Sequence, residues 1–455
     1  MTGVERSKKI FILAAPIVGG MIANNVVNLV DTAFVGYLGD NALAGVGIGL
    51  FINFIMLAIF LGLSVGVQTV TARNEGKNLT QQLFAPLNIG ILSSLLVSIP
   101  LAVLVYKLIP IIFPLINSDT EINAQGVAYL RGIVLGLPGF GILICFKGYW
   151  TGINRPSVYL VILLIVNFIN VVVAYMFVFG KCGLPAMGTF GVGLATSIAL
   201  WLGAVLHLLL AGRRFVKSGF LKTLPDIATI KVIFELSIAE GIRLVFFAAA
   251  FMVIFYILGK AGTAEIAAAN VLINVMLVLY LPILGLGSAV ISLVSQSLGR
   301  NDFRQASQWG WDVTKAGVLV LSILSIPLII FPAQLLEIFI KSPTTLAIAI
   351  APLRITYLIV VLEGVRTILM SALLGACDNK WVVVVFLSIQ WGLALPTAYV
   401  LVTFFKLGLL SVWLSQAFYT FLMAVIFAMR WQRKDQLAQL ESVDSSMLAE
   451  RGCEG

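Results

Sequence analysis

The residue best suited to chemistry in this sequence is Asp31, a carboxylate near the end of the apolar stretch 10–36. Asn24 and Asn28 precede it with helical spacing, so the three polar side chains share one helix face. An ionised Asp at the centre of a membrane helix costs about 2.5 to 3.5 kcal/mol, and we therefore expect Asp31 to face an ion or substrate path. The alternative is a protonated Asp that only joins helices by a hydrogen bond.

Further charged residues lie inside apolar stretches. Glu240 and Arg243 are three residues apart, as are Glu363 and Arg366, so each pair can meet on one helix face. They are candidates for substrate contact, and the alternative is a purely structural ion-pair network. Lys147 either extends to the membrane surface or pairs with Asp31, which would couple protonation to a helix contact.

Neutral polar side chains gather in the first half of the chain, namely Gln68, Asn167, Asn170 and Thr196. Around Asp31 they could line a small wet chamber that accepts a cation. Single Asn and Thr residues in membrane helices more often bridge helices, and this second interpretation stays open for each residue taken alone.

Motifs for catalysis are weak. Gly62, Ser64 and Gly66 fit G-x-S-x-G, but that motif needs a strand-to-helix turn and a histidine partner, and His207 lies in a leucine-rich run. No Walker A sequence is present, and the four cysteines have no metal-site or disulfide spacing. We expect no enzyme activity, no metal site and no cofactor other than a coupling ion.

The composition indicates a polytopic membrane protein, because 60% of the 455 residues are hydrophobic, 11% are charged and the mean hydropathy is +1.06. The apolar stretches predict an all-α fold with twelve spans at 10–36, 45–72, 84–112, 124–150, 157–180, 188–212, 230–258, 265–297, 310–338, 345–373, 381–405 and 408–430. Pro16, which removes a backbone donor, either bends the first helix or lies harmlessly in its first turns.

The basic residues are sorted by side of the membrane. Eighteen Lys and Arg fall in connections on one side and five on the other, with six more within or at the edges of spans. The positive-inside rule then places both termini in the cytoplasm. The net charge of +9 is therefore explained by topology, and we expect membrane lipid but no nucleic acid as a partner.

An internal repeat divides the chain. Shifting the sequence by 223 residues aligns the segment from Leu61 with that from Leu284, and Gly76, Lys77 and Asn78 fall on Gly299, Arg300 and Asn301. A repeat of six spans in the same direction predicts two lobes related by a pseudo-two-fold axis along the membrane normal. The predicted limits are a six-helix lobe at 1–212, a linker at 213–230, a six-helix lobe at 231–430 and a polar tail at 431–455.

These motifs together resemble the multidrug and toxic compound extrusion (MATE) transporters. The resemblance covers residues 10–430 and rests on AAPI from Ala14, NLVDTAFVGYLGDNALAGVG from Asn28, QTVTARNEGK from Gln68, NFINVVVAYMFVFG from Asn167, GVGLATS from Gly191 and SQSLGRND from Ser295. It implies two six-helix lobes around a cleft and the export of organic cations driven by H⁺ or Na⁺.

The resemblance also assigns roles to residues. Asp31 matches the coupling carboxylate of the family, with Asn170 and Thr196 beside it, while Ala174 replaces an Asp that usually follows the matched Asn. A Na⁺ site would lose an oxygen ligand there, whereas proton exchange needs one titratable carboxylate, so H⁺ coupling is favoured. Glu363 falls where part of the family carries an acidic residue, and the pattern looks closer to the DinF-like than to the NorM-like branch.

The sequence thus predicts a monomeric antiporter in a plasma membrane, such as a bacterial inner membrane, that exports cationic or amphipathic drug-like compounds. A flippase for lipid-linked oligosaccharides is an alternative, because Lys147, Arg243 and Arg366 could bind pyrophosphate. The second alternative is a passive channel or a non-transporting membrane protein.

Overall fold

The computed structural model describes residues 3–215, 220–221, 223 and 225–451, with the backbone alone described for 213–215 and 434–451. Within these residues the chain forms helices and turns and no strand. Among the described residues, eleven helices are long and apolar enough to cross a membrane, and a bent helix pair can supply a twelfth span. The predicted all-helical membrane fold is confirmed, except that the fourth span is broken.

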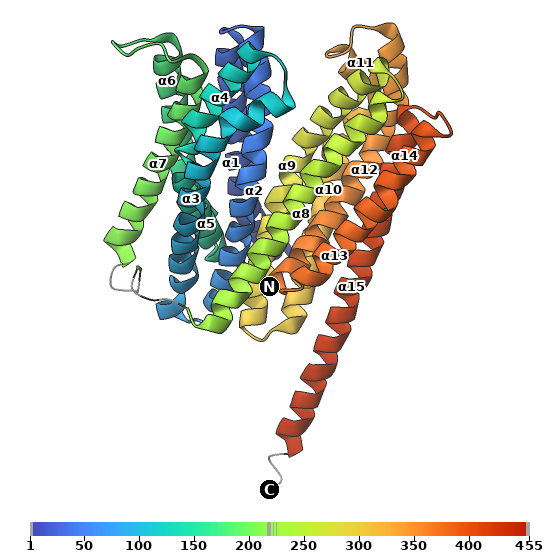
Figure 1. Ribbon diagram of the computed structural model, residues 1–455. Coiled ribbons are helices and arrows are strands. Elements are labelled where there is room, and N and C mark those ends of the chain that lie inside the picture. Colours follow the sequence, from blue (N-terminus) through green and yellow to red (C-terminus); the bar gives the residue numbers. More distant parts are fainter. Residues whose placement is uncertain (1–2, 216–219, 222, 224, 452–455) are drawn as a thin grey trace. The chain divides into compact units, whose positions relative to one another are not determined.

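Figure 1 shows the helices in chain order. The first half contains α1 (Gly3–Gly36), α2 (Asp40–Gly76), a short 3-10 turn (Thr80–Gln82), α3 (Ala85–Ile116), α4 (Thr120–Val134), α5 (Leu137–Gly152), α6 (Pro156–Phe179) and α7 (Gly188–Phe215). The second half contains α8 (Ile227–Gly259), α9 (Thr263–Gly299), α10 (Phe303–Ile330), α11 (Pro332–Glu337), α12 (Pro343–Gly375), α13 (Asn379–Ile389), a π-helical turn (Gln390–Ala394), α14 (Leu395–Thr403) and α15 (Leu409–Arg451). Residues 216–219, 222 and 224 of the predicted linker, and 452–455 of the predicted tail, lie outside the described residues.

The chain divides into two compact units, each named here after the half that supplies most of it. The N unit is Pro16–Ile242, and the C unit is Met1–Ala15 together with Arg243–Gly455. The predicted boundary between the lobes is the loop 213–230, whereas the boundaries between the compact units lie inside α1 and inside α8. The reason is that the first turns of each of these two helices pack with the helices of the opposite half.

The helix boundaries follow the repeat. α2 and α9 begin and end at positions 223 residues apart, and the bent pair α4–α5 spans the same positions as α12 at this offset. The turns repeat as well: Asn78 and Asn301 take left-handed φ values of 57° and 58°, and Asn154 and Cys377 both have a φ of 60°. The alignment made on sequence therefore describes a repeated backbone.

The fourth predicted span, 124–150, is two helices bent by 53° instead of one. Gly136 and Pro138 lie at the break, and a proline disfavours helical geometry in the residue before it. The corresponding residues in α12 are Ile359 and Val361, and α12 continues through them as a single helix. The break is thus encoded by two residues that differ between the repeats.

Each unit has its own apolar core. In the C unit, Leu272 of α9, Leu353 of α12 and Leu409 of α15 are buried together. In the N unit, one core cluster contains Val67 of α2 and Trp150 of α5. These clusters hold the helices that carry the polar residues described next.

Candidate functional site

A cavity of about 330 Å³ lies inside the N unit. Its walls come from α1, α2, α4, α5, α6 and α7, so residues distant in sequence meet there. The polar residues that sequence reasoning had grouped on its lining are Asn24, Asn28, Asp31, Asn167, Asn170 and Thr196. These six polar residues therefore line one cavity within one unit.

Amide and hydroxyl groups join three helices around this cavity. Asn167 Nδ2 donates to Asn24 Oδ1 at 3.0 Å, which links α6 to α1. Asn170 Nδ2 donates to Thr196 Oγ1 at 3.1 Å, which links α6 to α7. Asn167 and Asn170 are three residues apart and so share one face of α6. This face holds both contacts at once.

Among the described residues, two acceptor atoms at the cavity receive no hydrogen bond. Asp31 Oδ1 and Asn170 Oδ1 are buried, and neither receives a hydrogen bond from the described residues. A buried polar atom without a partner costs about 1–3 kcal/mol, more when it is charged. Among the described residues no donor reaches either oxygen, so the two oxygens fit a proton or a small cation. Such a group would supply positive charge beside Asp31.

Of the two alternatives considered for Lys147, the structure does not show the pairing with Asp31. Among the described residues no ion pair joins them, and Lys147 is absent from the cavity lining. α5 presents Phe140 and Leu143 to the cavity, while Lys147 lies one turn further along. Helical spacing alone could not tell which turn of α5 reaches the cavity.

Gln68 also lies away from the cavity, although it was expected in the chamber. It is 4% exposed on α2, where Gly148 and Gly152 of α5 come close to its backbone. It belongs to the packed contact between α2 and α5.

Sequence reasoning missed some lining residues. Asn53 of α2, Tyr129 of α4 and Tyr159 of α6 line the cavity, and its remaining walls are mostly apolar. Asn53 could have been found, because an amide within the apolar span 45–72 is as unusual as Asn170 in its own span. The two tyrosines carried no such signal, since aromatic residues are common in membrane helices.

Glu363, a buried acid of α12 in the C unit, has surroundings very different from those of Asp31. Arg366 Nε donates to Glu363 Oε2 at 2.8 Å and Arg366 Nη2 donates to Glu363 Oε1, so the pair on α12 is bidentate. Arg366 is 1% exposed, and its guanidinium lies over the Phe386 ring at 5.8 Å. The geometry matches the ion-pair alternative considered for these residues.

Glu240 and Arg243 lie on α8, and each is 7% exposed. They stand on either side of the division between the two compact units. The Arg243 guanidinium lies 5.5 Å from the centre of the Phe386 ring in the C unit. The roles predicted for these two residues stay predictions.

Comparison with known proteins places this geometry in context. The family model described as MatE matches residues 16–176 and 241–400. The "Probable multidrug resistance protein NorM" of Pasteurella multocida (strain Pm70) is 27% identical over 401 residues, which cover 87% of this chain and 86% of the relative.

Solved structures share the fold. One is described as the "Outward-facing conformation of a multidrug resistance MATE family transporter of the MOP superfamily", with a TM-score of 0.87, 18% identity, and 96% of this chain and 99% of that chain covered. Another, of "MATE in the bent conformation", has a TM-score of 0.87 and 18% identity, and covers 97% of this chain and 99% of that chain.

Proposed function

Because the chain belongs to the MatE family, a family of transporters, we propose that it is a secondary active multidrug efflux transporter that exchanges H⁺ for cationic or amphipathic organic compounds. The observation that carries the proposal is the unpartnered Asp31 Oδ1 at the N-unit cavity. A carboxylate in this position can hold either a proton or a positively charged group. Exchange of one for the other is the chemistry of an antiporter.

The surroundings of Asp31 support a proton as the coupling ion. Among the described residues that line the cavity, Asp31 is the single carboxylate, and the other titratable side chains are Tyr129 and Tyr159. Protonation turns one Asp31 oxygen from an acceptor into a donor, which the unpartnered Asn170 Oδ1 can use. Ala174 offers no side-chain oxygen for a Na⁺ site, in line with the preference for H⁺.

The cavity supports a drug-like substrate. Its volume of 330 Å³ is at the lower end of the range of about 300–1,000 Å³ typical of small-molecule sites. Apolar walls with a few amides and one carboxylate suit an amphipathic cation. The relative from Pasteurella multocida is named a multidrug resistance protein, which agrees with such a substrate.

In the proposed transport cycle, the protonation state of Asp31 controls the shape of α1. Protonation removes a buried charge, so α1 can bend or repack near Pro16 and reduce the cavity volume. Substrate then leaves to the outside.

We also propose that the protein is a monomer in a plasma membrane with both termini in the cytoplasm, and that it belongs to the DinF-like branch.

A flippase for lipid-linked oligosaccharides is less well supported. Such a substrate carries a pyrophosphate, yet among the described residues none that lines the N-unit cavity is basic. Arg366, which could have served it, already binds Glu363.

Transport in everted vesicles tests the proposal. Asp31→Asn should abolish substrate uptake driven by a proton gradient, and Asp31→Glu should keep part of it. Asp40→Asn is the matched control, since it removes an exposed acid at the start of α2 and should transport like the wild type. Full transport by Asp31→Asn would refute the mechanism, as would substrate-induced proton release that is absent without Na⁺.

A further inference from the structure

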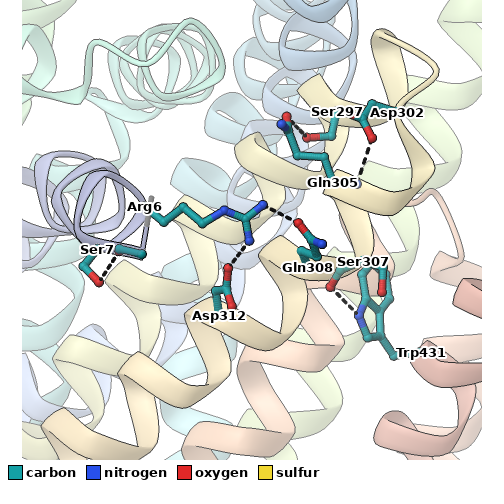
Figure 2. A network of polar contacts seen from close by, with 10 residues as sticks. Arg6, Ser7, Ser297, Asp302, Gln305, Ser307, Gln308, Asp312 and Trp431 are labelled. Atoms are coloured by element: carbon teal, nitrogen blue, oxygen red, sulfur yellow. Dashed lines mark hydrogen bonds and ion pairs between the residues drawn. The ribbon is translucent and has the colours of Figure 1, made fainter. Parts of the chain in front are cut away.

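In the C unit the first turns of α1 lie against α10 through charged and aromatic contacts, and Figure 2 shows the ion pair and the hydrogen bond of Arg6. Arg6 forms an ion pair with Asp312, and Arg6 Nη2 donates to Gln308 Oε1 at 2.5 Å. The Arg6 guanidinium lies 4.9 Å from the centre of the Trp309 ring, and the Lys9 amine lies 5.6 Å from it. One arginine thus makes three contacts with α10, which we call the Arg6 anchor.

The surface that receives Arg6 is firmly packed. Trp309 is 1% exposed, so its ring is held by its neighbours. The Trp431 indole Nε1 of α15 donates to Ser307 O at 3.4 Å (Figure 2), and Ser307 directly precedes Gln308, which contacts Arg6. We therefore expect any movement at this contact to occur on the α1 side.

The N unit holds the start of α8 in another way. Gly66 of α2 lies so close to α8 that a Cβ there would be 2.6 Å from Ile233 O and 2.7 Å from Ser237 Oγ. Ser237 Oγ already donates to Ile233 O within α8. This is close backbone packing, and separating it would leave a void between two helices.

The Arg6 anchor, in contrast, is open to water. The side chains of Arg6 and Asp312 are 16% and 30% exposed, and both line an open cavity of about 1020 Å³. Ion pairs reached by water contribute about 0.2–1 kcal/mol, so such a contact can break and form again. α1 begins in the C unit and α8 begins in the N unit, and of these two helices α1 is the one whose start is held by a releasable contact.

α1 connects this anchor to the proposed coupling residue. It is one helix from Gly3 to Gly36, it leaves the C unit between Ala15 and Pro16, and it carries Asp31 at the N-unit cavity. Because the start of α1 is fixed on α10, a movement of α1 at Asp31 must bend the helix between Arg6 and Asp31. Pro16 lies in this segment and lacks the backbone donor of a regular turn, so the helix is expected to bend there. Without the anchor, the whole helix could tilt instead.

We propose that Arg6 is a positioning residue of the transport cycle, whose releasable contact with Asp312 and Gln308 fixes the start of α1 so that events at Asp31 bend the helix near Pro16. The proposal rests on the proposed function. Arg6 does not touch the N-unit cavity, so its loss should slow the cycle and leave substrate binding intact.

The first test compares Arg6→Gln with Lys8→Gln, which removes an exposed charge two residues away on the same helix. Arg6→Gln should lower the maximal transport rate up to about fivefold with an unchanged KM, the change expected for a shift of about 1 kcal/mol in one equilibrium. Lys8→Gln should behave like the wild type. The exchange Arg6→Asp with Asp312→Arg should restore most of the rate. A wild-type rate in Arg6→Gln, or a raised KM in it, would overturn the proposal.

The second test does not depend on transport. Nitroxide labels are placed on Val4→Cys and Leu319→Cys, which are 80% and 62% exposed, in a full-length chain whose four cysteines are changed to alanine. In lipid nanodiscs the distance distribution should be narrow with Arg6 present and broad in Arg6→Gln. Identical distributions would refute the anchor even if the wild type pumps. Loss of all proton-driven uptake in the wild type would refute the proposed function and leave the anchor standing.

Discussion

The two halves of this protein share a backbone but use their buried acids in opposite ways. Asp31 lies at a cavity in the N unit, and one of its oxygens has no partner among the described residues, while both oxygens of Glu363 in the C unit bind Arg366. At the repeat offset, Asp31 corresponds to Ile254 and Glu363 corresponds to Phe140, which itself lines the N-unit cavity. A repeated helical framework therefore does not imply repeated chemistry.

The physical difference is whether the charge is satisfied. A bidentate arginine contact satisfies a carboxylate and fixes it in one state, because removing either partner leaves an uncompensated buried charge. An unsatisfied carboxylate can instead exchange its partner. We expect the N unit to carry the coupling step and the C unit to contribute stability at Glu363.

The largest expected effect comes from breaking the satisfied pair. Glu363→Gln leaves the Arg366 guanidinium buried without its counter-charge, and should lower the free energy of unfolding by about 3–5 kcal/mol. The double variant Glu363→Gln with Arg366→Met should regain most of this loss. Thermal unfolding in detergent measures both, with the exposed Glu337→Gln as control. A stable single variant that loses transport would instead make Glu363 a coupling residue.

A smaller effect is expected at the amide beside the cavity. Asn170→Ala removes the hydrogen bond to Thr196 and an acceptor near Asp31, and should weaken substrate binding by about 0.5–1.5 kcal/mol. Fluorescence titration with a cationic dye measures the Kd. Asn25→Ala, at an exposed site on α1, is the control. An unchanged Kd would show that Asn170 only joins α6 to α7.

The smallest effect on stability should come from neutralising Asp31, and the change in the free energy of unfolding should have the opposite sign to that at Glu363. Asp31→Asn removes a charge whose Oδ1 has no partner among the described residues, so the free energy of unfolding should stay constant or rise by about 1 kcal/mol. The same unfolding assay applies. A clear loss of stability would mean that Asp31 is satisfied as Glu363 is, and the contrast between the units would fail.

Much of the fold was predictable because it depends on local patterns. Long apolar stretches must form helices in a membrane, since backbone groups there need partners within the chain. The 223-residue repeat then predicted corresponding elements, down to the left-handed Asn78 and Asn301. The exception is the bend at Gly136 and Pro138. It has a local cause, but the prediction of twelve spans used hydropathy and did not consider these two residues.

The site was predictable in part. Asn167, Asn170 and Thr196 were grouped with Asp31 because polar side chains are rare in apolar spans, and the structure brings them together. Gln68 and Lys147 share that rarity but lie elsewhere, because their direction depends on how α2 and α5 are rotated in the packed unit. Rarity identifies a residue as unusual and does not say which residues it will meet.

The sequence by itself determined the helical membrane fold, the repeat and the small set of buried polar residues, since hydropathy and residue spacing act over a few turns of chain. Only the tertiary structure decided that Asp31 is left unsatisfied at a cavity, that Glu363 is neutralised by Arg366, and that α1 begins on α10 through Arg6. These outcomes depend on contacts between helices far apart in the chain, where packing rotates each helix and so selects the partners of its side chains.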